Sequence, residues 1–64
     1  MTHDLLIYLS KKVQDEIDVL SGDLARGTAK DHGEYKYACG IIRGLMMANG
    51  FIAEAAQRME QDDD

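Results

Sequence analysis

Histidine and cysteine are the side chains of this sequence best suited to bind a metal or to act as a nucleophile. The chain has two histidines, His3 and His32, and one cysteine, Cys39. A structural zinc site needs four converging ligands, and neither histidine has another ligand-type residue three or four positions away, the spacing that shares a helical face. Cys39 follows His32 by about two helical turns, so the thiol lacks a neighbouring base. We therefore expect no metal, cofactor or catalytic residue, and we expect Cys39 to serve as a small buried hydrophobe.

Acidic side chains are the next candidates, because paired carboxylates can act as a general acid and base. Pairs such as Asp15 with Glu16, or Asp18 with Asp23, alternate with apolar residues at helical spacing, which places them on a solvated polar face. A glycine-rich phosphate loop would have to follow a strand, and no strand pattern is evident. The sequence therefore predicts neither an enzyme nor a protein with a small-molecule substrate.

Charge and hydropathy argue against two further classes of partner. Twelve acidic and seven basic residues give a net charge of −5, and the basic residues form no cluster that could follow a phosphate backbone. The apolar run 38–53 is about 16 residues long and contains Arg43, whereas about 20 apolar residues are needed to span a bilayer. No basic segment followed by a hydrophobic stretch opens the chain, which predicts no secretory signal. We expect a cytoplasmic location, no nucleic-acid partner and no membrane.

The apolar residues of the first half recur at intervals of three and four, which predicts an amphipathic helix over about residues 3–26. Thr2 or Asp4 can cap its start. Gly27 follows the last periodic residues and fits a C-terminal glycine cap, because glycine adopts a left-handed conformation at little cost. The predicted stripe is Leu6, Leu9, Val13, Ile17, Leu20 and Leu24.

The second half predicts a turn over residues 27–31 and a longer helix over about residues 32–60. Asp31 followed by Glu34 is typical of a capping box, and Thr28 is the alternative cap. A short connection between two long helices favours an antiparallel hairpin. The fold class predicted is therefore all-α, a two-helix hairpin followed by an acidic tail over residues 61–64 that we expect to be solvated and frayed.

Residues 32–60 carry two apolar stripes, and the single stripe predicted for the first helix can cover only one of them. The first stripe is Tyr35, Ala38, Ile42, Leu45, Asn49, Ile52, Ala56 and Met59, and the second is Tyr37, Ile41, Gly44, Ala48, Phe51 and Ala55. An apolar patch left in water usually marks an interface, and chains this short often depend on oligomerisation for stability. The predicted protein-binding residues are Tyr37, Ile41, Gly44, Met47, Ala48 and Phe51.

Small and polar residues qualify this prediction. Gly40, Gly44 and Ala48 are four apart, so they line one side of the helix, where a neighbouring backbone could approach closely or where glycine is simply tolerated. Asn49 interrupts the first stripe. Its amide could set the register of an oligomer, or it could bond to a polar group of the first helix such as Ser10.

The stretch LARGTAKDHGEYKYACGIIRGL over residues 24–45, with RMEQDDD from residue 58, resembles short acidic open reading frames of tailed bacteriophages. In that family an A-x-G-x-A-K-D turn leads into E-Y-K/R-x-x-x-G-x-I-x-G-L, and the protein closes on acidic residues. The likeness covers about two-thirds of the chain, with Ile41 an apolar residue where a polar one is often found. It implies an accessory role in podovirus-type head and tail gene clusters, and it transfers no active residue.

We expect a non-enzymatic structural or assembly protein of a phage, located in the host cytoplasm or the virion. Its partner would be another copy of itself, as a homo-oligomer, or a larger virion protein. One alternative is a small phage inhibitor that masks a host enzyme surface or imitates the charge of DNA. A second is an RNA-binding dimer of the Rop type, which the hairpin resembles in outline although the residues do not match.

Overall fold

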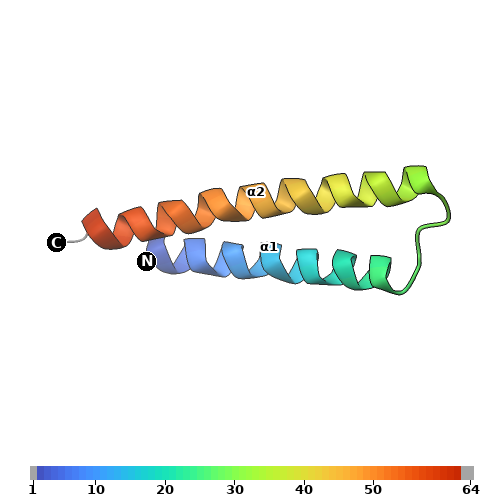
Figure 1. The fold of residues 1–64 in the computed structure, drawn as a ribbon. Helices are drawn as coiled ribbons and strands as arrows, with labels where there is room; N and C mark the ends of the chain where they lie inside the picture. Colours follow the sequence, from blue (N-terminus) through green and yellow to red (C-terminus); the bar gives the residue numbers. More distant parts are fainter. Residues whose placement is uncertain (1, 63–64) are drawn as a thin grey trace.

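The computed structural model describes residues 2–62, which form two α-helices and no strand (Figure 1). Helix α1 spans Thr2–Ala25 and helix α2 spans His32–Asp62. The two helices lie side by side and run in opposite directions, joined by the short segment 26–31. The predicted all-α, two-helix hairpin is therefore the observed fold.

The helix ends lie within two residues of the predicted positions. α1 begins and ends one residue earlier than expected, and α2 continues to Asp62. Gln61 and Asp62 therefore belong to the helix and not to the acidic tail. The remainder of that predicted tail, Asp63 and Asp64, lies outside the described residues.

A glycine ends α1 as predicted. Gly27 has a φ of 80°, a left-handed conformation that costs glycine little. Its N–H donates to the carbonyl of Leu24 over 3.0 Å, and the N–H of Thr28 donates to the carbonyl of Asp23 over 3.2 Å. This pair of bonds is the Schellman motif, which satisfies carbonyls that the last turn would otherwise leave without partners.

The capping box at the start of α2 is also confirmed, with one difference in detail. The N–H of Glu34 donates to Oδ1 of Asp31 over 2.8 Å. The Glu34 carboxylate reaches back in return, but it accepts a 2.7 Å bond from the N–H of Lys30 and not from the cap residue itself. The two caps together fix the reversal of the chain at residues 26–31.

The contact between the helices is a seam of residues that repeat strictly by three and four. Ile17 and Ala56 are its most buried members, at 7% and 8% exposure, and the others are half-buried. We call this set the core seam: His3, Leu6, Ser10, Val13, Ile17, Leu20 and Leu24 of α1 with Ala38, Ile42, Leu45, Asn49, Ile52, Ala56 and Met59 of α2.

Two residues predicted for the seam lie outside it. Leu9 is 41% exposed, and the neighbouring Ser10 takes the seam position. Tyr35 is also exposed, so the seam of α2 begins at Ala38. A helix turns by about 100° per residue, so a shift of one position moves a side chain from the contact to its flank.

A polar rung explains why a serine replaces a leucine in the seam. The hydroxyl of Ser10 donates to Oδ1 of Asn49 over 2.6 Å. The Asn49 amide also donates to Oε1 of Gln14 over 3.3 Å. The alternative in which Asn49 bonds across the hairpin to Ser10 is therefore the one observed, and the rung aligns the two helices.

Candidate protein interaction surface

The second stripe of α2 is left uncovered by α1. We call it the outer stripe: Tyr37, Ile41, Gly44, Ala48, Phe51 and Ala55. Tyr37 and Phe51 are 73% and 66% exposed, and only Ala55 is half-buried. All six residues predicted to bind protein are exposed in the hairpin, including Met47, which lies three residues after Gly44 and four before Phe51 and so borders the stripe.

The glycines of α2 make no close contact within the hairpin. A methyl group added at Gly40, Gly44 or Gly50 would meet nothing within 4 Å. The close backbone approach considered for Gly44 is therefore not made with α1. The notch at this position opens away from the core seam.

Helix α1 contributes more apolar surface than the sequence pattern predicts. The expectation of one apolar stripe on α1 is wrong, because several large apolar side chains lie outside the core seam. Leu5, Leu9 and Val19 are among them, at 55%, 41% and 55% exposure. Their spacing of four and ten residues keeps them close to one face of the helix.

These α1 residues lie on the same side of the hairpin as the outer stripe. In α2, Ile41 and Ala48 each lie one residue before a member of the core seam. In both cases the next member of the seam follows that one three residues later. Leu9 occupies the equivalent position before Ser10. Equivalent flanks of two antiparallel helices are related by a two-fold axis perpendicular to the hairpin plane, so they face the same way. We call the combined surface the outer face: the outer stripe with Leu5, Leu9 and Val19.

The charges on the outer face are few, and those of α2 lie at its two ends. Arg58 and Glu34 continue the outer stripe by one step at either end of α2. Near the middle of α1, Lys12 and Glu16 interrupt the apolar side chains, and the Lys12 ammonium lies 5.7 Å from the ring centre of Tyr8. The stretch of α2 between Tyr37 and Ala55 places no charge on this face.

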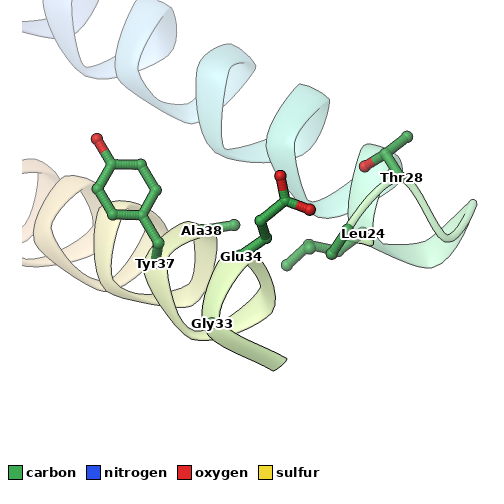
Figure 2. Close-up of a pocket in the computed structure, with 7 residues that line it drawn as sticks. Leu24, Thr28, Gly33, Glu34, Tyr37 and Ala38 are labelled. Atoms are coloured by element: carbon green, nitrogen blue, oxygen red, sulfur yellow. The ribbon is translucent and has the colours of Figure 1, made fainter. Parts of the chain in front are cut away.

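A cavity of about 400 Å³ opens where the outer face meets the turn. Figure 2 shows that Leu24 of α1, Thr28 of the turn, and Glu34 and Tyr37 of α2 line it, with Ala29, Gly33 and Ala38 completing the wall. The Glu34 carboxylate is already engaged in capping α2. The cavity therefore lacks the converging polar groups that fix a small ligand, and it forms a hollow at one end of the apolar surface.

Among the described residues, the side chains that could act as nucleophiles or metal ligands are not grouped into a site. Cys39 is half-buried, one turn after Tyr35. The pKa of Tyr35 is raised, first by hydrogen bonding to that thiol and to a smaller extent by repulsion from its charge. A raised pKa opposes formation of a phenolate nucleophile. Within residues 2–62, no three His, Cys, Asp or Glu side chains lie close enough together to hold a metal ion.

Neither described helix has an apolar stretch of the length and hydropathy needed to cross a bilayer. No family model, curated protein or solved structure matches the chain. The hairpin presents an extended apolar surface along one side of a rod that is 51 Å long and 14 by 12 Å across.

Proposed function

We propose that the chain is a non-enzymatic assembly protein that acts through helix–helix contacts of its outer face. The observation that carries this proposal is the excess of exposed surface. A folded monomer of this mass exposes about 4,100 Å² on average, whereas the hairpin of 7.1 kDa exposes 5129 Å². The excess of about 1,000 Å² is close to the 800 Å² or so that each partner buries in a standard protein interface.

The thin core supports the same proposal. An unfolded chain of this mass exposes about 10,300 Å², so the hairpin buries only about half of that surface, against about 60% for an average domain of 60 residues. No side chain among the described residues is fully buried, and the radius of gyration is 14.9 Å where about 10.7 Å is usual for this length. A partner on the outer face would supply the missing burial.

The setting is proposed from the resemblance to short acidic proteins of tailed bacteriophages. On that basis the chain acts in the host cytoplasm or in the virion, and its partner is a second copy or a larger virion protein. The outer stripe carries the contact, and Tyr37, Ile41 and Phe51 supply the largest side chains. The charge-free middle of this stripe favours an apolar contact over mimicry of a nucleic acid.

Sedimentation equilibrium combined with thermal unfolding tests the proposal. The purified chain should either associate or, if it needs a larger partner, fail to melt cooperatively when alone. A monomer that unfolds in one cooperative transition would contradict the proposal, because such a hairpin would need no partner. Mass spectrometry of purified particles from the source would then show whether the polypeptide is part of the virion.

A further inference from the structure

The outer stripe of α2 has an internal symmetry in the sizes and charges of its side chains. Reversing the helix about the level of Met46 exchanges position 34 with 58, 37 with 55, 41 with 51, and 44 with 48. The exchanged residues are an acid with a base, a tyrosine with an alanine, an isoleucine with a phenylalanine, and a glycine with an alanine. The outermost pair is complementary in charge and the tyrosine–alanine pair in volume, whereas the two inner pairs join side chains of similar size.

From this symmetry we infer that the partner is a second copy of the chain, with α2 packed antiparallel on α2 about a two-fold axis at the level of Met46. The inference rests on the proposed function and makes it specific. Residues of the outer stripe repeat by three and four, as the seam residues of antiparallel helices do. A two-fold contact is self-complementary, which is the property that the paired positions show.

The middle of the stripe allows the two helices to approach closely. Gly44 faces Ala48 of the other copy on both sides of the axis, and a methyl group at Gly44 would meet nothing within the hairpin. Ile41 then packs against Phe51 of the other copy in the next rung outward. These are the exposed side chains that a single hairpin leaves in water.

The ends of the stripe select the antiparallel direction. In the inferred dimer Glu34 lies opposite Arg58 of the other copy, and the same pair recurs at the other end. A parallel arrangement would place each of these residues opposite its own copy, so that like charges meet at both ends. Both side chains are exposed, and neither takes part in an ion pair among the described residues. One oxygen of Glu34 accepts the Lys30 N–H bond, which leaves the other oxygen for Arg58 of the other copy.

The positions of two charged residues on α1 are consistent with the same two-fold axis. Asn49 contacts Ser10 and Gln14, so the level of Met46 falls near the middle of α1, between Lys12 and Glu16. The two-fold axis then places Lys12 of one copy within about one turn of Glu16 of the other. Packing α1 on α2 of the other copy would instead set these two charges against the apolar outer stripe, where they have no partner.

The size of the outer face matches a stable dimer. A rod 51 Å long and 14 Å wide presents a footprint of about 700 Å², close to the 800 Å² or so that each partner contributes to a standard interface. The second copy therefore covers the whole length of the hairpin and needs no additional chain.

Nitroxide labels on the far side of α2 test the inference by pulsed dipolar spectroscopy. Cysteines are placed one at a time at Arg43 and Gln57, both exposed, in a Cys39→Ala background. In the inferred dimer the two labels at position 57 lie about 33 Å apart along the axis, and those at position 43 about 9 Å, from the rise of 1.5 Å per residue. The lateral separation of the two labels is common to both positions, so the distance measured at position 57 should still clearly exceed that at position 43.

Each other outcome has a distinct meaning. Similar distances at the two positions would show that the two α2 helices run parallel, so the antiparallel inference would fall while the proposed function stands. Absence of dipolar coupling from an unfolded chain would rule out the second copy and leave a larger partner. Absence of coupling from a cooperatively folded monomer would overturn both.

Discussion

The two stripes of α2 have the same spacing and similar composition, yet only one of them is covered in the hairpin. The first stripe packs against α1 in the core seam, which includes the two most buried residues, Ile17 of α1 and Ala56 of α2. The outer stripe carries two aromatic side chains, Tyr37 and Phe51, and faces solvent in the single chain. Periodicity alone therefore identifies surfaces that can pack, and the partner available decides which of them does.

The largest expected effect lies in the core seam. Ile17→Ala removes a side chain that is only 7% exposed, and it should lower the free energy of unfolding by about 2 kcal/mol or more. Ile7→Ala on the same helix is the matched control, because Ile7 is 51% exposed and belongs neither to the seam nor to the outer face. Urea denaturation of both variants at one fixed protein concentration, at which the native protein is folded, measures the difference. Equal losses would contradict the assignment of the seam.

The next effect separates the outer stripe from the rest of α2. Gly44→Leu and Gly50→Leu both add a side chain into open space within the hairpin, and both raise helix propensity. In the inferred dimer only Gly44 faces the other copy, so Gly44→Leu should weaken association at least tenfold, about 1.4 kcal/mol. Gly50→Leu should leave association unchanged. Sedimentation equilibrium of the two variants makes the comparison, and similar association constants would argue against close packing at Gly44.

A smaller effect is expected at the polar rung of the core seam. Asn49→Ala removes the partner of the Ser10 hydroxyl and should cost about 1 kcal/mol of stability. In a Ser10→Ala background the same substitution should cost less, because that hydrogen bond is already absent. A cycle of the four proteins in urea measures the coupling, and strictly additive losses would contradict a direct bond.

The smallest effect concerns the charges that continue the outer stripe. Arg58→Gln and Glu34→Gln should each raise the dimer dissociation constant by a few-fold at low salt, since exposed ion pairs contribute about 0.5 kcal/mol each. Glutamine at position 34 keeps an oxygen that can accept the Lys30 N–H bond. The double variant should lose little more than either single variant, and the differences should fade in high salt. Losses that add in full would show that the two positions do not meet.

The features of the fold that depend on neighbouring residues along the chain could be predicted from the sequence. Gly27 as a C-terminal cap, and Asp31 with Glu34 as a capping box, are signals within one or two helical turns. The bond between Ser10 and Asn49 was one of two alternatives, since it depends on how the helices align. These elements suffice to define a hairpin.

The register of the core seam and the extent of the outer face could not be predicted in the same way. After Leu6, the next seam residue could be Leu9 or Ser10, because steps of three and of four both fit a helical repeat. Leu9 is the wrong choice, because Asn49 supplies a hydrogen-bond partner for Ser10. Once Leu9 lies outside the seam, it joins Leu5 and Val19 on the outer face. That surface depends on the pairing of two helices, which no single helix encodes.

The central claim, that another molecule covers the outer stripe, is tested most directly by the reactivity of two tyrosines. Tyr37 lies in the outer stripe and is 73% exposed in the single hairpin, whereas Tyr35 lies outside the outer face and is 49% exposed. Hydroxyl-radical labelling read by mass spectrometry compares the two rings in one sample of the native protein. We predict that Tyr37 reacts several-fold more slowly than Tyr35 and that dilution removes the difference. Oxidation of Tyr37 at least as fast as that of Tyr35 at every protein concentration would show that the outer stripe is bare, which would contradict the claim that another molecule covers it.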